Sequence, residues 1–340
     1  MKNELDNRFL NSFNTVRLLG AVNVMFIHTM RHMSINLPKL LSDPICFFEG
    51  VPIFYVLSGF LIWISLSNNS DFKQYAKKRF LRIYPELWVA IVVEVISILL
   101  LYFENINWGG LAVFTFTQST IFQFYTPDFL RGYGCGVPNG SLGTIGELIQ
   151  CYIVIWFIYK LIHNKKLWNW VCLLGISILI SVFSPLLENC LPQIVYKLYM
   201  ASFITYFWMF LLGAFVANYF DRIVPVLKKY YLVLLGLSIF FVVFPQFDVR
   251  VRYAFGRSVC LTLGLIGFAY KFPKWNVPID ISYGIYLYHM IFVNIMIELG
   301  IKGTVSSMLV VFAVTILCAY VSNSFIGSKN KLVWRKNRRI

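Results

Sequence analysis

The sequence predicts an all-α integral membrane protein, a polytopic bundle of about ten transmembrane helices with cytoplasmic N- and C-termini. Three observations predict this. Of the 340 residues, 59% are hydrophobic and only 13% charged, with a mean hydropathy of +0.69, whereas soluble domains carry about 25% charged residues. Apolar runs of about 20 residues, the length that crosses a bilayer as a helix, follow one another along the chain. Lys and Arg residues gather in alternate loops between these runs.

Ten apolar segments are long enough to be spans. Their approximate bounds are 16–36, 45–66, 87–103, 142–162, 168–187, 199–219, 230–247, 255–270, 281–299 and 304–326. The stretch 109–124 is apolar but interrupted by Thr, Gln and Ser, and we interpret it as re-entrant or interfacial. No polar block is long enough for a soluble domain. We therefore expect a single membrane domain over 1–340, with a short cytoplasmic N-terminus (1–15), a basic cytoplasmic tail (327–340) and no appended soluble domain.

The distribution of charge sets the expected orientation. With the N-terminus inside, 22 of the 30 Lys and Arg residues fall in cytoplasmic segments and 8 fall outside. The positive-inside rule therefore places both termini in the cytoplasm, which ten spans satisfy and eleven do not. The net charge of +15 lies in short loops between spans, which argues for membrane lipids and against nucleic acid as the partner.

The seven Cys show no CxxC or Cys/His spacing, so we expect no metal.

Two ionisable residues on the first predicted span need a reason, because charge inside a membrane is costly. Arg17 and His28 are separated by ten residues, close to three helical turns, so they share a face about 16 Å apart. His32 follows one turn later. Two roles fit this spacing. Arg17 could bind a phosphate or carboxylate while His28 takes a proton from a hydroxyl. Alternatively, Arg17 could be an interfacial anchor and His28 a buried ring that is hydrogen-bonded to a neighbouring helix.

The next two segments carry weaker signals. Ser58 and Gly59 in the second span allow the close approach of another backbone or of a ligand, and packing is the commoner use. The basic segment 77–85 is interpreted as a cytoplasmic loop that sets orientation and contacts lipid headgroups. Glu94, in the middle of the third span, is expected to be a buried partner of an arginine or histidine.

Five segments, taken together in this order, resemble acyltransferase family 3, whose members O-acylate bacterial surface polysaccharides such as the O-antigen of lipopolysaccharide. They cover nearly the whole chain. They are the Arg17–His28 pair, GVPIFYVLSGFLIW (50–63), KKRFLRIYPELW (77–88) with Arg79 and Arg82 as its RxxR element, NGSLGTIGELIQCY (139–152) and ISYGIYLYH (281–289).

The resemblance implies a membrane O-acetyltransferase of the bacterial cytoplasmic (inner) membrane. His28 would be the catalytic base. Arg17, Arg79 and Arg82 would bind the phosphates of acetyl-CoA, the acyl donor, on the cytoplasmic side. The acyl group would pass to a hydroxyl of a cell-surface glycan or lipid-linked oligosaccharide on the outer side.

The chain departs from the family's pattern at 139–152. The family usually has Trp where this chain has Gly143, and its acid usually falls one residue later, where Leu148 stands. Two roles therefore stay open for Glu147, the family's acid after a local shift or a structural residue. Family members often carry an extracytoplasmic hydrolase-like domain, so here the membrane domain or a partner is expected to complete the transfer.

Further residues are candidates to line the site. Ser58 and Asn139 are polar groups that could stabilise an oxyanion, His289 ends the family-like YLYH stretch, and a covalent acyl intermediate on His28 or Ser58 is also open. A second candidate set lies in a predicted outer loop and at the start of the span that follows it. Its arginines could bind an acidic glycan, a lipid-linked diphosphate or anionic lipid headgroups: Arg250, Arg252 and Arg257.

Three other classes of membrane protein fit the sequence less well. A polymerase or glycosyltransferase for lipid-linked glycans is expected to carry a large polar outer loop, whereas the longest loop here, 104–141, has few charges. A transporter or flippase for polyprenyl-linked glycans is expected to show inverted repeats with broken helices, which this sequence lacks. A non-catalytic scaffold would leave the aligned Arg17 and His28 without a role.

Overall fold

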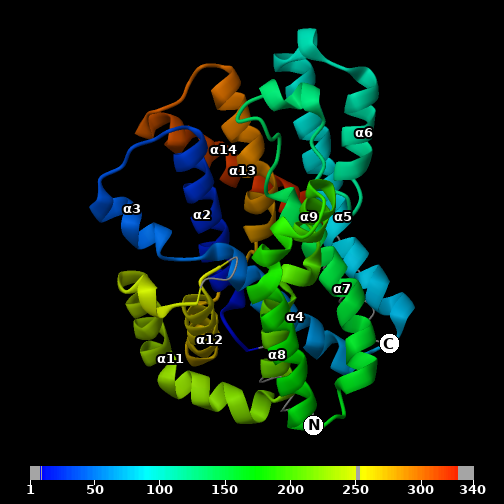
Figure 1. The fold of residues 1–340 in the computed structure, drawn as a ribbon. Helices are drawn as coiled ribbons and strands as arrows, with labels where there is room; N and C mark the ends of the chain where they lie inside the picture. The colour runs from blue at the N-terminus through cyan, green and yellow to red at the C-terminus, as the bar shows by residue number, and fades with distance from the viewer. Residues whose placement is uncertain (1–7, 9, 250–252, 328–340) are drawn as a thin grey trace. The chain divides into compact units, whose positions relative to one another are not determined.

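The computed structural model describes residue 8, residues 10–249 and residues 253–327. All regular secondary structure in these ranges is helical, as the sequence predicts (Figure 1). The chain divides into two compact units, each built from three separate stretches. The first unit takes 1–20, 47–72 and 150–279, and the second unit takes 21–46, 73–149 and 280–340.

Three helices of the described chain run from one unit's stretch into the other's: α2 (Phe13–His32), α5 (Phe72–Leu101) and α7 (Leu142–Ile162). The first unit also contains α4 (Gly50–Asn68), α8 (Leu167–Phe183), α9 (Gln193–Met200), α10 (Phe207–Asn218), α11 (Phe220–Val243) and α12 (Phe255–Lys271). The second unit contains α3 (Lys39–Cys46), α6 (Trp108–Gln118), α13 (Ser282–Glu298) and α14 (Val305–Ser322). Short 3₁₀ or π turns are Phe103–Asn105, Asp128–Gly132, Ser184–Asn189, Phe203–Thr205, Pro245–Phe247, Pro273–Trp275 and Asn323–Gly327.

Helix pairs form the framework of the first unit. α11 and α12 lie side by side (Figure 1). α4 and α10 approach at two glycines, because a Cβ on Gly59 would overlap the carbonyl of Phe210 and a Cβ on Gly213 would overlap the carbonyl of Val56. The backbones therefore meet where a side chain is absent, as small residues allow between membrane helices. Of the two uses predicted for Gly59, the structure shows the first, the close packing of another backbone, here that of α10.

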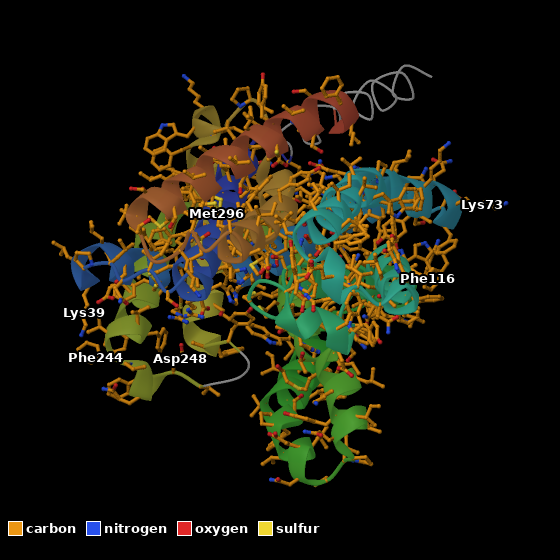
Figure 2. The ribbon with its side chains drawn as sticks, turned by 90° about the horizontal axis from the view of Figure 1, so that it is seen from above. Lys39, Lys73, Phe116, Phe244, Asp248 and Met296 are labelled. Carbon is orange, nitrogen blue, oxygen red and sulfur yellow. The ribbon has the colours of Figure 1, made fainter. Side chains whose placement is uncertain are left out.

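The core of the second unit lies where α2, α13 and α14 meet. α13 and α14 pack side by side (Figure 1), and a Cβ on Gly284 would collide with Ala319. Met296 of α13 (Figure 2) joins a buried apolar cluster contributed by these three helices and the segment after α2. The cluster's buried members are Phe26, Met33, Ile35, Val293, Met296, Met308 and Val311. This core fixes α2 against α13.

Six helical segments of the described chain are long and apolar enough to cross a membrane, judged by length and composition. They are Lys39–Asn68, Phe72–Leu101, Leu142–Ile162, Leu167–Asn189, Phe220–Val243 and Val305–Ile326. Each of the ten predicted spans coincides with or overlaps a helix, and the re-entrant stretch 109–124 overlaps α6. The count of ten spans and the orientation of the termini stay predictions.

The structure corrects the interpretation of the basic segment. Residues 77–85 are not a loop but lie inside α5, which begins at Phe72 and continues through Pro85. Lys and Arg are good helix formers, so a run of them extends an apolar helix as readily as it ends one. Membrane helices also tolerate proline, because neighbouring groups satisfy the freed backbone carbonyl. Arg79 and Arg82 are therefore held on a rigid helix.

Candidate active site

Two histidines that lie far apart in the sequence meet in the second unit. Nδ1 of His28, on α2, is 3.0 Å from Nε2 of His289, on α13. The ring centroids are 5.2 Å apart. His289 has no exposed surface, while His28 is half-buried. The structure thus brings together the predicted base and one of the predicted site-lining residues.

His289 is fixed by two further contacts. Its Nδ1 lies 2.9 Å from the backbone carbonyl oxygen of Ile285, one turn earlier in α13. Its Nε2 lies 3.2 Å from Oγ of Ser141, in the turn before α7. Ser141 is buried. The imidazole pair therefore lies where α2, α13 and the turn before α7 converge.

The turn before α7 is itself tied to α13. The amide nitrogen of Asn139, a predicted oxyanion residue, donates to the backbone carbonyl of Leu287 at 2.9 Å. Its side-chain oxygen is buried and accepts no hydrogen bond from a described residue. The hydroxyls of Thr144 and Tyr286 share a further hydrogen bond. One donor of Asn139 is thus engaged in holding the backbone.

Asn294 clamps the preceding turn from the other end of α13. Its amide donates to the carbonyls of Val137 at 3.1 Å and Pro138 at 2.6 Å. Its oxygen accepts from the backbone N–H of Cys135 at 2.8 Å. Glu298, one turn later, accepts from the backbone of the same turn. Sequence analysis did not single out Ser141 or Asn294, although a polar residue inside an apolar span is a signal for Asn294.

His32 lies beside His28 as the helical spacing predicts. The two rings are in edge contact, with centroids 5.7 Å apart. His32 and its neighbour Arg31 are exposed. The end of α2 therefore carries a basic, accessible group one turn beyond the imidazole pair.

The RxxR arginines lie in the first half of α5. Nη2 of Arg82 pairs with Oδ2 of Asp280 at 3.1 Å. The Arg82 side chain is 45% exposed and that of Asp280 only 6%, so Arg82 compensates a buried carboxylate. The other oxygen of Asp280 accepts from the backbone N–H and the hydroxyl of Ser282, the first residue of α13. Arg79 lies over the ring of Tyr75, 5.8 Å from its centroid.

The remaining predicted site residues belong to different parts of the chain. Arg17 is half-buried in the stretch of α2 that belongs to the first unit, and Ser58 lies in α4 of the same unit. Glu147 is buried in α7 within the second unit. One turn earlier, a Cβ on Gly143, where the family usually has Trp, would meet nothing within 4 Å. The roles predicted for these residues stay predictions.

The outer arginine set is only partly described. Arg250 and Arg252 lie outside the described residues. Arg257 forms an ion pair with Glu49, whose second oxygen also accepts from Ser258 at 2.8 Å. Arg257 is therefore engaged within the first unit, and acceptor binding by this set stays a prediction.

Glu94 does not have the partner that the sequence predicts. Its side chain is buried in α5, and neither carboxyl oxygen has a hydrogen-bond partner among the described residues. The nearby Ser97 hydroxyl instead donates to the backbone carbonyl of Glu94 at 2.7 Å and shares a hydrogen bond with the Tyr133 hydroxyl. Burial raises the pKa of Tyr133, in the loop after α6, to about 12, so this phenol stays protonated at neutral pH.

Among the described residues, no group of three or more His, Cys, Asp or Glu side chains could hold a metal ion.

Comparison with known proteins places the chain in a family. Residues 10–323 match the sequence model of the family Acyl_transf_3, described as an acyltransferase domain. The chain is 26% identical over 334 residues to nodulation protein 10 of Rhizobium leguminosarum bv. viciae, covering 88% of each protein. It is also 27% identical over 284 residues to the peptidoglycan O-acetyltransferase OatA of Listeria monocytogenes serovar 1/2a (strain ATCC BAA-679 / EGD-e). This second match covers 71% of the chain and 44% of OatA.

No solved structure matches the chain. The family match nevertheless spans nearly the whole sequence and agrees with the resemblance drawn from the five segments. The apolar helices add that the protein is embedded in a membrane and crosses it more than once. This chain is a multi-pass membrane protein that belongs to acyltransferase family 3.

Proposed function

We propose that this protein moves an acetyl or other acyl group from cytoplasmic acyl-CoA to a hydroxyl of a cell-surface or lipid-linked glycan, with His28 as general base. The observation that carries the proposal is the contact of 3.0 Å between Nδ1 of His28 and Nε2 of His289. It engages one nitrogen of His28, and no described residue forms a hydrogen bond to the other, Nε2. An imidazole with one accessible ring nitrogen can remove a proton from a hydroxyl near neutral pH.

The proposed reaction is a direct acyl transfer. The acceptor hydroxyl oxygen attacks the thioester carbonyl carbon while Nε2 of His28 takes the hydroxyl proton. The C–S bond of the tetrahedral intermediate then breaks, and the leaving CoA sulfur takes the proton back from His28. A new O-acyl ester and free CoA are the products. The route through a covalent acyl group on His28 or Ser58 is a variant of the same transfer.

Donor binding is assigned to the arginines Arg79 and Arg82 of α5 and to Arg17 of α2. A guanidinium presents a fork of donors that suits phosphate oxygens. Support comes from the position of Arg82 on α5, where its side chain is 45% exposed. Asn139 or Ser58 would stabilise the oxyanion; in Asn139, one amide hydrogen is already given to Leu287.

The proposed acceptor follows from the similarity of this chain to OatA. OatA is named a peptidoglycan O-acetyltransferase, and the chain spans less than half of that protein, so a glycan hydroxyl is a proposal for this chain. We place the protein in the bacterial cytoplasmic membrane, where a cytoplasmic donor and an outer glycan are both within reach. The outer arginines Arg250, Arg252 and Arg257 are proposed to contact an acidic or diphosphate-linked acceptor.

The proposal is tested in cells that lack the gene and in cells that carry it. Glycans from both are treated with mild alkali, which removes O-acyl esters, and compared by mass spectrometry. We expect acyl masses that disappear with alkali only where the protein is made. Identical O-acyl content in both strains, with the protein present in the membrane, would contradict the proposal.

The donor assignment makes a kinetic prediction for Arg82. Replacing Arg82 by Gln should raise the KM for acetyl-CoA about 10-fold or more with little change in kcat, because a hydrogen bond to a charged group contributes roughly 1.5–3 kcal/mol. Arg82→Lys keeps the charge that faces Asp280 and should give a smaller rise. The measurement is CoA release against acetyl-CoA concentration.

The matched control is Lys77→Gln, an exposed cation earlier in the same helix. It should leave KM near the wild-type value. An Arg82→Gln protein with an unchanged KM would remove Arg82 from the donor site.

A further inference from the structure

The order of hydrogen bonds around His289 determines where its proton lies. A backbone carbonyl only accepts, so the contact of 2.9 Å between Nδ1 of His289 and the oxygen of Ile285 requires a hydrogen on Nδ1. A neutral imidazole carries a single N–H. In the neutral ring, Nε2 of His289 is therefore an acceptor. The hydroxyl of Ser141, 3.2 Å away, can donate to it.

The same reasoning passes from His289 to His28. Since Nε2 of His289 accepts, the atom that faces it at 3.0 Å, Nδ1 of His28, must donate. His28 then carries its hydrogen on Nδ1, and its lone pair is left on Nε2. The chain of donors runs in one direction, from Nδ1–H of His28 to His289 and from Nδ1–H of His289 to the carbonyl of Ile285.

We propose that His289 is a positioning residue, which holds His28 in the Nδ1–H tautomer and so presents the lone pair on Nε2 to the acceptor hydroxyl. This inference rests on the proposed function of His28 as the base. Without His289, the His28 ring could carry its hydrogen on either nitrogen and could rotate. Only one of these states could take a proton through Nε2.

The arrangement also suits the protonated state of His28. Once Nε2 has taken the hydroxyl proton, both ring nitrogens of His28 are donors. Nδ1–H keeps its acceptor on His289, so the charged ring retains a hydrogen bond throughout the step. His289 itself gains no proton and its bond to Ile285 does not change. A neutral, fully buried imidazole thus supports the base.

The surrounding contacts hold His289 in place for this role. Ser141 approaches from the turn before α7, which Asn139 ties to α13, and Thr144 ties the first turn of α7 to the same helix. His163 offers an internal comparison, because its Nδ1 also lies within 2.8 Å of a carbonyl one turn earlier, that of Tyr159. No second imidazole contacts it among the described residues, so it has the same local geometry without the pair.

The tautomer can be measured directly in the wild-type protein. The chain has four histidines, at 28, 32, 163 and 289, so ¹⁵N-histidine labelling gives few imidazole signals in magic-angle-spinning NMR of the protein in liposomes. Signals are assigned by their loss in His→Gln variants at 28, 32 and 163, and the signals that remain in all three belong to His289. We expect His28 to show a protonated Nδ1 and an unprotonated Nε2, with a correlation from Nδ1 of His28 to Nε2 of His289. A hydrogen on Nε2 of neutral His28 would overturn the inference.

Enzyme kinetics supply a second test of the positioning role of His289. Leu at 289 removes the acceptor, and we expect His289→Leu to lower kcat on the order of 100-fold while leaving the KM for acetyl-CoA unchanged, as expected when a base loses its tautomer partner. Gln can place an amide oxygen near the former Nε2, so His289→Gln should stay within about 10-fold of wild type. His163→Gln and His163→Leu are matched controls and should differ little from each other.

The outcomes separate this inference from the proposed function. Wild-type kcat in His289→Leu, or an equal loss in the Leu and Gln variants, would overturn the positioning role while acyl transfer by the wild type still stands. An inactive wild type would overturn the proposed function instead. The tautomer measured by NMR does not depend on turnover and does not require any variant at 289 to fold.

Discussion

Replacing His28 by alanine is expected to lower the rate of acyl transfer by roughly 10²- to 10⁴-fold, the usual contribution of a general base. The change removes Nε2, the nitrogen that the contact with His289 leaves as acceptor. It also leaves a small apolar side chain on α2, whose packing against α13 relies on other residues such as Phe26 and Val293. The measurement is CoA release by the purified protein with acceptor present.

The control for this prediction is His163→Ala. His163 is a histidine at the end of α7 that stacks on Tyr159 and belongs to the first unit. It should keep nearly the wild-type rate. A His28→Ala protein that transfers acyl groups as fast as His163→Ala would exclude His28 as the base.

Replacing Gly59 by alanine is expected to cause a large loss of folded protein. The added methyl group would overlap the backbone carbonyl of Phe210, and backbone cannot move aside as a flexible side chain does. α4 and α10 would have to move apart, and this would also open the contact between Gly213 of α10 and the Val56 carbonyl of α4. Overpacking of this kind costs about 1–3 kcal/mol or more. The measurement is the monodisperse fraction and thermal midpoint in detergent.

Gly175→Ala is the matched control for the glycine contact. Gly175 lies in α8 of the same unit, and a Cβ there would meet nothing within 4 Å. Alanine is also the better helix former, so this variant should be as stable as wild type or slightly more stable. Equal stability of Gly59→Ala and Gly175→Ala would show that the close approach of α4 and α10 does not determine the stability of the folded protein.

The helices could be predicted from the sequence because a span needs a long apolar run and the chain supplies them one after another. The predicted segment 142–162 has the same bounds as α7, and 255–270 differs from α12 by one residue. The prediction was wrong where charge was interpreted as the end of a helix. α5 begins at Phe72, well before the predicted start near 87, since basic residues at a membrane surface do not interrupt a helix.

The candidate site could be predicted only residue by residue. His28 was singled out by its place on a span, and His289 by the family-like stretch that it ends. Their contact could not be predicted, because 261 positions separate them and apolar periodicity does not say which helices pack together. Ser141 was missed because a serine in a turn before a helix has many ordinary uses. Glu94 was expected to have a charged partner, which composition alone could not exclude.

The central claim, acyl transfer from acyl-CoA to a glycan hydroxyl, is tested most directly with purified protein in liposomes supplied with acetyl-CoA and extracted lipid-linked glycans. Free CoA and new O-acetyl ester are measured in the same sample. We expect the two products to appear in equal amounts and only when an acceptor is present. Intact acetyl-CoA together with glycan that has crossed the membrane unmodified would contradict the account and identify a transporter instead.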